Sequence, residues 1–336
     1  MNRVLLVTAV NPEADAVCAG MMGMWQPWTA PATTGPSRGG PVPSWDRQLL
    51  TAVRLGPYLG RRSGSVTVLA AGAAGPAAAA GTATALATAR AAGEPFDLVI
   101  SLGIAGGFTD RAGIGDLVVA DALIAADLGA ESGLDASSGK PAPGSSPAGP
   151  ASGAGSGAGS TSEAGGGTGG FLGLDELGLG PSTLLPRANV VQLLVDLLAG
   201  TGRTIRIGPI LSVSTITGTD HRAAAMALRF DPAAEAMEGY AVGVAATAFD
   251  TPFAEVRAVS NAVGRRERSS WDVPGALAGL SAAAAGIAAG IAAGIDTLTT
   301  VLPASPGSTT PGRTGTGRTG TGRTEPVKPA PGVGTP

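Results

Sequence analysis

Short, continuous apolar runs are the feature that most limits the folds open to this chain. Three such runs, residues 4–10, 65–70 and 96–102, each end near Gly, Pro or Asn, and an alanine-rich segment, 76–92, separates the last two. Apolar runs of this length are typical of strands covered on both faces, and the alanine-rich segment has the length of a crossover helix. The pattern therefore predicts an α/β fold in which strands and helices alternate.

Further elements extend this pattern along the chain. A helix is expected directly after the first strand, more strands at 116–122, 208–214 and 253–259, and more helices at 184–198, 233–249 and 275–302. The alternation predicts one three-layer αβα domain, residues 1–302, around a central mixed, largely parallel sheet.

Three segments have the composition of unstructured chain. Residues 25–44 are rich in Pro, Thr and Gly, residues 135–170 consist almost wholly of Gly, Ser, Ala and Pro, and residues 303–336 repeat Gly, Arg and Thr. Such segments bury too little apolar surface to offset the entropy lost on ordering. We expect a flexible insertion at 135–170 and a disordered tail at 303–336, which leaves about 240–260 structured residues, a usual size for one domain.

Composition excludes several functional classes. The net charge is only −3, so the chain lacks the basic surface of a nucleic-acid-binding protein. One cysteine, Cys18, and one histidine, His221, exclude a disulfide framework and a zinc site, and no metal or cofactor is expected. Glu13 and Asp15 follow the first apolar run too soon for a secretory leader, so we expect a buried first strand and a cytoplasmic protein.

A glycine pattern near the end of the predicted domain raises the alternative of a membrane span. Gly286, Gly290 and Gly294 have the small-xxx-small spacing of packed membrane helices. Alanine and glycine are only weakly apolar, however, and Asp296 closes the run. We favour a soluble terminal helix that packs closely on the sheet, and we expect no membrane partner.

Three polar residues stand where predicted elements end. Glu13 follows the first strand, at the edge where α/β sheets collect functional groups, although it could equally be an acid at a helix N-terminus. Glu238 lies in an apolar Ala-Val run, where a buried carboxylate needs donors such as two sugar hydroxyls; alone, it could be a surface acid. Asn261 could terminate a strand, or its amide could pair with a 6-oxopurine. Together they indicate one shared pocket.

A glycine-rich segment, Gly103–Gly107, follows the strand at 96–102. We predict a turn there whose backbone N–H groups, including those of Ala105 and Gly106, closely approach a ligand. The segment lacks the lysine of a phosphate-binding P-loop.

The order and spacing of three motifs resemble the nucleoside phosphorylase and nucleosidase superfamily, most closely its futalosine hydrolase family. The motifs are Gly103-Ile104-Ala105-Gly106-Gly107-Phe108, Glu235-Ala236-Met237-Glu238-Gly239, and Ser260-Asn261-Ala262-Val263-Gly264-Arg265-Arg266-Glu267-Arg268 followed by Trp271. The resemblance covers about half of the chain and omits the insertion and the tail. It implies a phosphorylase/hydrolase-like fold, a small-molecule nucleoside as substrate, and a homo-oligomer.

The resemblance also implies roles for individual residues. The acid at Glu13 would activate water, and Glu238 would bind the ribose hydroxyls with Met237 against the sugar. Relatives that release adenine usually have aspartate where this chain has Asn261, which agrees with hypoxanthine as the leaving base. The implied reaction is hydrolysis of the N-glycosidic bond of futalosine, a step of menaquinone biosynthesis.

The implied substrate-binding set also contains Ala105, Gly106 and Ser260, together with Arg265 and Arg268. Arg265, Arg266 or Arg268 could meet the benzoate carboxylate of futalosine, because a planar guanidinium suits that group; the alternative is a solvated charge run. Other purine nucleosidases are alternatives, as are phosphorolysis, which the apolar Ile104 and Ala105 disfavour, and a binding module without turnover, which would have no use for Glu13.

Overall fold

The computed structural model describes residues 3–23, 50–131 and 171–293, all of which belong to one compact unit. The predicted unstructured segments at 25–44, 135–170 and 303–336 lie outside these described residues.

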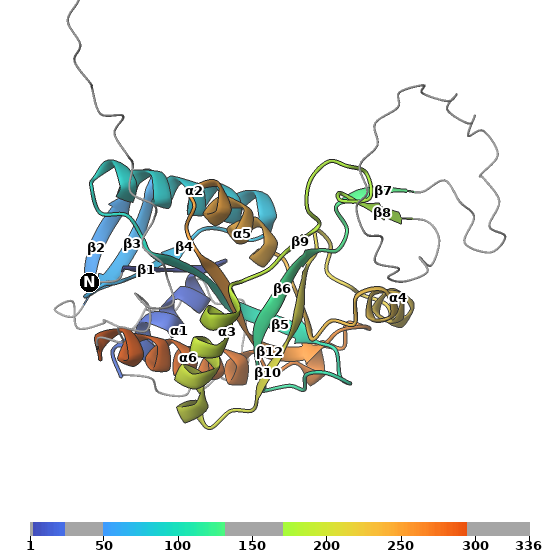
Figure 1. Cartoon of the computed structure of the whole chain (residues 1–336). Coiled ribbons are helices and arrows are strands. Elements are labelled where there is room, and N and C mark those ends of the chain that lie inside the picture. Colours follow the sequence, from blue (N-terminus) through green and yellow to red (C-terminus); the bar gives the residue numbers. More distant parts are fainter. Residues whose placement is uncertain (1–2, 24–49, 132–170, 294–336) are drawn as a thin grey trace, which may run out of the picture. The chain divides into compact units, whose positions relative to one another are not determined.

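One mixed sheet forms the centre of the fold (Figure 1). Its strands lie in the order β11-β10-β6-β12-β5-β1-β4-β3-β2, and β9 pairs with β6 off this path. Their bounds are β1 Val4–Thr8, β2 Thr51–Leu55, β3 Tyr58–Ser63, β4 Val66–Ala70, β5 Leu98–Gly107, β6 Leu117–Ala125, β9 Thr183–Leu184, β10 Ile205–Ser212, β11 Ala234–Ala236 and β12 Phe253–Ala262. A separate pair consists of β7 Gly129–Glu131 and β8 Phe171–Gly173.

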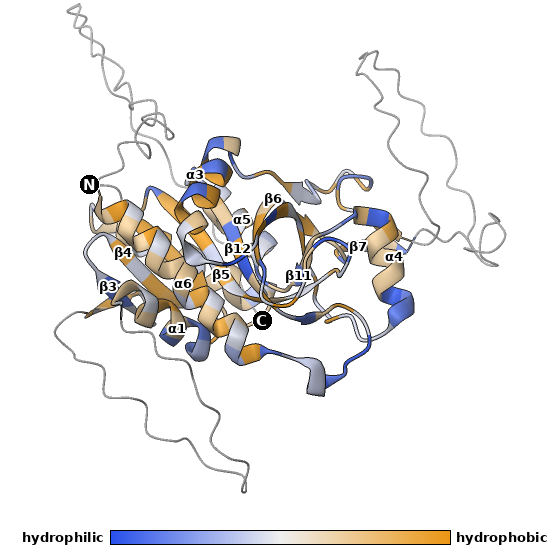
Figure 2. Ribbon diagram, turned by 90° about the horizontal axis from the view of Figure 1, so that it is seen from below, coloured by the Kyte–Doolittle hydropathy of each residue, from blue (hydrophilic) through white to orange (hydrophobic). Residues whose placement is uncertain are grey.

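The parallel strands β4, β1, β5 and β12 are the strands predicted from the apolar runs. Every residue of β1 is buried, as expected for a strand covered on both faces. Beyond β12 the sheet curls, because β11 pairs with both β10 and β5 and closes a ring of five strands. Part of this ring is seen end-on in Figure 2. The ring brings β5, β11 and β12, far apart in the sequence, to one place.

Helices cover both faces of the sheet, which confirms the three-layer αβα prediction. The helices are α1 Asn11–Met21, α2 Gly75–Ala91, α3 Ala188–Leu198, α4 Asp220–Phe230, α5 Gly239–Ala248 and α6 Val273–Ala292. Apolar residues of α1, α3 and α6 share one core with the sheet, and those of α2 and α5 share another. In Figure 1 these two groups lie on opposite sides of the strands.

Two predicted elements differ in the structure. Residues 103–107 are not a turn but the last part of β5, because they continue the pairing with β12 and β11. Residues 233–249 are not one helix: β11 comes first and α5 begins at Gly239. The pairing of β11 with two strands overrides the helix propensity of its alanines.

The prediction at 184–198 differs only at its start. Leu184 pairs in β9, and α3 begins at Ala188. Pro186 accounts for this difference, since the residue before a proline avoids the helical conformation.

The helix predicted at 275–302 is α6, whose described part ends at Ala292. It is the one helix in the described ranges that is long and apolar enough to cross a membrane, with 20 residues and a mean hydropathy of 1.7. Its buried residues pack instead against α1, α3 and the sheet. A Cβ atom at Gly286 would lie 2.5 Å from the carbonyl oxygen of Leu197, so this glycine allows the close approach of α3.

Candidate active site

A cavity of about 250 Å³ opens at the carboxyl ends of β1, β5 and β12, where an α/β sheet is expected to hold its functional groups. The predicted residues that line it are Glu13, Ala105, Gly106, Met237, Glu238, Ser260 and Asn261. Segments that are far apart in the sequence therefore contribute to a single site, as predicted.

Glu13 lies in the first turn of α1, directly after β1. Its carboxylate accepts hydrogen bonds from the backbone N–H groups of Ala9 (2.9 Å), Val10 (3.2 Å) and Ile104 (3.0 Å), and the residue is only 4% exposed. Glu13 therefore caps its own helix and also lines the cavity. Its three backbone donors fix the carboxylate in place.

Arg257, which sequence reasoning missed, is buried next to the cavity-lining residue Glu238. This residue of β12 is 1% exposed; its guanidinium donates to Glu255 (2.7 Å) and to the Ser101 hydroxyl (3.0 Å) and pairs with Glu238 (3.4 Å). A charged pair at positions i and i+2 of an apolar strand, here Glu255 and Arg257, was the available signal, because these residues share one face.

Gly103 leaves space for the side chains of both Arg257 and the catalytic candidate Glu13. A Cβ atom at position 103 would lie 2.2 Å from an Nη atom of Arg257 and 2.8 Å from Oε1 of Glu13. The glycine at the end of β5 thus contributes to the site because it has no side chain and leaves space for these two groups, not because it forms a turn.

Burial sets the protonation behaviour of these acids. It raises the pKa of Glu13, and the nearby Arg257 guanidinium works against that rise. Burial likewise raises the pKa of Glu255, again opposed by Arg257. One arginine therefore faces three carboxylates, those of Glu13, Glu238 and Glu255.

Glu238 is the residue directly before α5, and it lines the cavity beside Met237. One oxygen accepts a hydrogen bond from the backbone N–H of Ala74 (2.9 Å), and the other pairs with Arg257. Ala74 has φ 68° and ψ 162°, a region used almost only by glycine, at a cost of about 1–3 kcal/mol. This strained residue directs its N–H at Glu238 and so helps to hold the carboxylate.

Ser260 and Asn261 stand at an irregularity of β12, where the register with β5 shifts between Val259 and Asn261. Such a bulge turns the following side chain. The Ser260 hydroxyl donates to Oδ1 of Asn261 (2.8 Å) and lies 3.2 Å from the carbonyl oxygen of Ala105. Asn261 thus belongs to a strand rather than to a turn. Its amide is oriented by Ser260 and lies next to Gly106.

Other residues complete the cavity wall. Ile216 and Thr217 come from the loop between β10 and α4, Glu235 from β11, and Trp271 from the segment before α6. None of these four belonged to the predicted site, because none ends a predicted strand.

Neither Arg265 nor Arg268 is among the residues that line the cavity. Arg265 pairs with Asp220 (3.3 Å) and has a 72% exposed side chain, and Arg268 is exposed in a short 3-10 helix, Arg268–Ser270. Arg266 is better placed, since its guanidinium lies 5.3 Å from the ring centre of Trp271, a lining residue.

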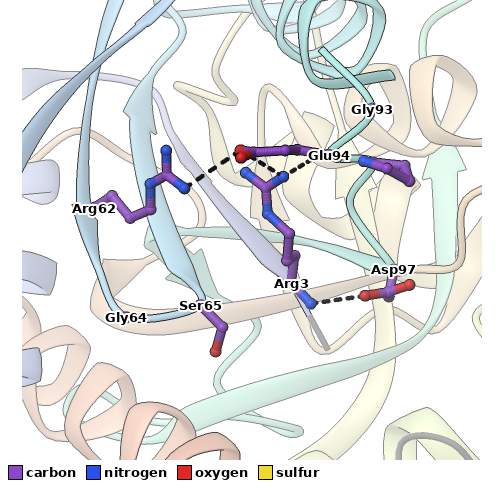
Figure 3. Close-up of a pocket in the computed structure, with 8 residues that line it drawn as sticks. Arg3, Arg62, Gly64, Ser65, Gly93, Glu94 and Asp97 are labelled. Carbon is purple, nitrogen blue, oxygen red and sulfur yellow. Dashed lines mark hydrogen bonds and ion pairs between the residues drawn. The ribbon is translucent and has the colours of Figure 1, made fainter. Parts of the chain in front are cut away.

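A second cavity, of about 400 Å³, lies at the opposite edge of the sheet, near the amino ends of β1 and β4 (Figure 3). Its charged groups satisfy one another. Arg3 pairs with Glu94 (2.9 Å), its backbone N–H donates to Asp97 (2.7 Å), and Arg62 also pairs with Glu94 (3.4 Å). This cavity therefore offers no poised acid or base, and the first cavity remains the candidate active site.

The chemistry available in the first cavity is that of carboxylates and an amide. A fixed, buried carboxylate can take a proton from water, a second can accept hydrogen bonds from hydroxyl groups, and an amide can bind a heterocycle. Within the described residues, no group of three or more His, Cys, Asp or Glu side chains has an arrangement that could hold a metal ion.

Sequence comparisons show the family of the chain. The family model described as Phosphorylase superfamily matches residues 52–293. A futalosine hydrolase of Acidothermus cellulolyticus is 37% identical over 274 residues, 81% of this chain and 85% of that protein. A futalosine hydrolase of Streptomyces coelicolor is 38% identical over 192 residues, 57% of this chain and 65% of that protein; the match thus spans just under two thirds of the Streptomyces relative.

Solved structures of the same fold cover most of the chain. A 5'-methylthioadenosine/S-adenosylhomocysteine nucleosidase from Neisseria meningitidis, in complex with methylthio-immucillin-A, has a TM-score of 0.56 at 17% identity, over 85% of this chain and 98% of that one. The native futalosine hydrolase of Helicobacter pylori has a TM-score of 0.54 at 14% identity, over 84% of this chain and 94% of that one. At such low identity these likenesses establish the fold alone.

Proposed function

Because this chain belongs to the phosphorylase superfamily, we propose that it hydrolyses the N-glycosidic bond of futalosine and releases hypoxanthine and dehypoxanthine futalosine. One observation carries the proposal: a buried carboxylate, Glu13, faces the same cavity as the amide of Asn261. The two futalosine hydrolases that match the chain support the choice of substrate.

The reaction breaks the bond between the sugar and the base. As the purine departs with the bonding electrons, positive charge develops on the ribose ring, as in other glycoside hydrolyses. Water then attacks the anomeric carbon, and Glu13 takes its proton. The pKa of Glu13, raised by burial, brings this base closer to neutral pH.

Glu238 and Met237 hold the sugar. The Glu238 carboxylate accepts hydrogen bonds from the ribose hydroxyls, while Ala74 and Arg257 keep it in position. Arg257 pairs with Glu238, lies close to Glu13 and is a positioning residue: its fixed charge keeps the two carboxylates in one compact site despite their mutual repulsion.

Asn261 binds the leaving base. Its amide has no acidic proton to give up, so it stabilises the negative charge on N7 and O6 of hypoxanthine by hydrogen bonding. The purine anion then takes a proton from solvent water, and Glu13 returns its proton to solvent. The contact with Ser260 keeps the amide in one orientation. The pairing of the Asn261 amide with the purine favours a 6-oxopurine over adenine.

Water is a better nucleophile for this cavity than phosphate. The lining carries the carboxylates of Glu13, Glu235 and Glu238, and the nearby Arg257 already pairs with acids. A phosphate dianion would be repelled there, because it needs cationic or hydroxyl donors that the apolar Ile104 and Ala105 do not supply.

Finer features of the activity belong to the same proposal. The benzoate carboxylate of futalosine would meet an arginine of the segment Arg265–Arg268, in which Arg266 is best placed through its contact with Trp271. We also infer a cytoplasmic homo-oligomer that acts in menaquinone biosynthesis, with residues 1–302 as the catalytic domain.

A base-release assay tests this function. Purified protein is mixed separately with futalosine, inosine and methylthioadenosine, with and without phosphate, and the free base is measured. We expect hypoxanthine from futalosine in phosphate-free buffer. Adenine from methylthioadenosine as the main product, or release that requires phosphate, would point to the rival activities, and no base at all would point to a binding module.

A further inference from the structure

Glu235 is a buried acid that the proposed reaction does not use. It is 5% exposed, lies in β11 and lines the cavity. Its carboxylate accepts hydrogen bonds from both the backbone N–H (2.8 Å) and the hydroxyl (2.5 Å) of Thr217. A charged group is costly to bury, so its retention at the cavity wall calls for a role.

The loop between β10 and α4 is held by two such contacts. At its start, Asp127 accepts hydrogen bonds from the backbone N–H (2.9 Å) and the hydroxyl (2.8 Å) of Ser214. Three residues later, Glu235 binds Thr217 in the same way. Thr217 and Glu235 line the cavity, whereas Ser214 and Asp127 do not. The two contacts are thus chemically alike, but only one faces the ligand space.

The contact between Glu235 and Thr217 lies at the end of the cavity where the purine is proposed to bind. Glu235 pairs with Gly106 across the β11–β5 ladder, and Gly106 in turn pairs with Asn261. Glu13 is bound two residues earlier on β5, at Ile104. The loop residues Ile216 and Thr217 therefore belong with Asn261, the group that binds the purine, rather than with the water-activating acid.

We propose that Glu235 is a positioning residue that fixes Thr217 and Ile216 as the wall against which the purine base packs. This inference rests on the proposed function, because it takes the ligand to be a purine nucleoside. Hydrogen bonds to a buried carboxylate are stronger than those between neutral groups, so this contact holds the loop firmly. Base affinity then depends on an acid that never touches the bond being broken.

The charges around Glu235 agree with such a role. Arg222 and Asp127 are the charged groups that act on it, and they pair with each other (3.3 Å). Burial raises the pKa of Glu235, against the contacts from Thr217. Protonation at acid pH would take one acceptor away from Thr217 and loosen the wall.

The test compares Thr217→Val, Glu235→Ala and Glu235→Gln in the full-length protein. The affinity for hypoxanthine is measured by calorimetry. KM and kcat are measured with futalosine as the substrate. Thr217→Val and Glu235→Ala should each weaken hypoxanthine binding about tenfold, as expected for the loss of a hydrogen bond to a charged group, and should raise KM more than they lower kcat. Glu235→Gln keeps an acceptor for the Thr217 N–H and should restore most of the affinity.

Ser214→Ala is the matched control, because it removes an equivalent hydroxyl–carboxylate bond from the same loop outside the cavity. It should leave hypoxanthine affinity within about twofold. The double variant Thr217→Val/Glu235→Ala should bind no more weakly than either single variant, since the two changes remove one shared contact. Thermal melting shows whether each variant folds. If Glu235→Ala does not fold, the hypoxanthine affinities of Glu235→Gln and Thr217→Val test the proposal.

Three results would overturn the assignment: unchanged hypoxanthine affinity in Thr217→Val, an equal loss in Ser214→Ala, or a loss confined to kcat in the Glu235 variants. Failure of the proposed function looks different. In that case the wild type binds hypoxanthine without cleaving futalosine, and the binding comparison alone still tests the wall. A wild type that binds neither hypoxanthine nor adenine would contradict both proposals.

Discussion

At the scale of single residues, the site depends on one arginine shared by several acids. Arg257 contacts Glu238 and Glu255 directly and lies close to Glu13. Three ionised carboxylates beside one guanidinium would leave a buried excess of negative charge, which is costly. Glu255 is the acid best suited to stay neutral, because it is fully buried and its Oε2 atom has no hydrogen-bond partner among the described residues.

The variant Glu255→Gln tests this interpretation through the pH dependence of stability. The raised pKa of Glu255 means that the fold holds this proton more tightly than the unfolded chain does. The associated stability is complete below the unfolded pKa and is lost as pH rises through the folded pKa. Glutamine cannot ionise, so the melting temperature of the variant minus that of wild type should become more positive from about pH 4 towards pH 8.

Glu131→Gln is the control for removing one negative charge, since Glu131 is exposed in β7. Its difference from wild type should vary little with pH. A Glu255→Gln variant that loses stability relative to wild type as the pH rises would show that the ionised carboxylate is needed, and the neutral assignment would be wrong.

Residues at strand ends could be predicted from the sequence, and residues inside strands could not. Glu13 follows an apolar run and Asn261 lies at the end of another, so both stood out, whereas Arg257 and Glu235 lie inside strands. The i, i+2 spacing of Glu255 and Arg257 puts two charges on one face of a strand, but it does not show whether that face is buried. The prediction for Arg265 and Arg268 came from charge type and from the motif; both residues are exposed in the structure, and their role in binding stays a prediction.

At the scale of elements, helix α1 carries the proposed base, and its position depends on close packing against α6. A Cβ atom at Gly20 would lie 1.9 Å from the carbonyl oxygen of Ser281. The two helices lie side by side below the sheet in Figure 1 and share one apolar core. Any side chain at position 20 must therefore push α1 away from α6.

Gly20→Ala should destabilise the fold by about 1–3 kcal/mol, the usual cost of overpacking a core. The displacement acts on the helix that holds Glu13, so turnover should fall together with the melting temperature. Gly200→Ala adds the same methyl group where no atom lies within 4 Å, and it should melt close to wild type. Equal melting temperatures for the two variants would show that α1 and α6 tolerate separation.

The elements that formed as predicted have a strong local signal, namely apolar runs for β1, β4 and β5 and a long alanine-rich stretch for α2. The segment 233–249 was wrongly predicted as one helix because its alanines favour helix, while the pairing of β11 is fixed by strands far away in the sequence. The helix α4 and the β2–β3 hairpin were not predicted either. Tertiary pairing rather than propensity decided the conformation of β11.

At the scale of the whole molecule, the sequence predicted a three-layer fold, and the structure confirms it. The closed ring formed by β5, β12, β6, β10 and β11 was not predictable, because three of its five pairings join segments more than 100 residues apart. That ring sets Glu235 and Asn261 against the end of β5 that carries Gly106. The proposed function thus depends on the closed ring of strands as much as on the parallel strands next to Glu13.

The most direct test of the account is the rate of hypoxanthine release from futalosine, in phosphate-free buffer, by wild type and by Glu13→Gln, with hypoxanthine affinity measured on the same preparations. Wild type should release the base. Glu13→Gln should bind hypoxanthine as wild type does but release it at least about a hundredfold more slowly, because a glutamine cannot take a proton from water. Near-normal release by Glu13→Gln, or none by wild type, would contradict the proposal that Glu13 activates water for this cleavage.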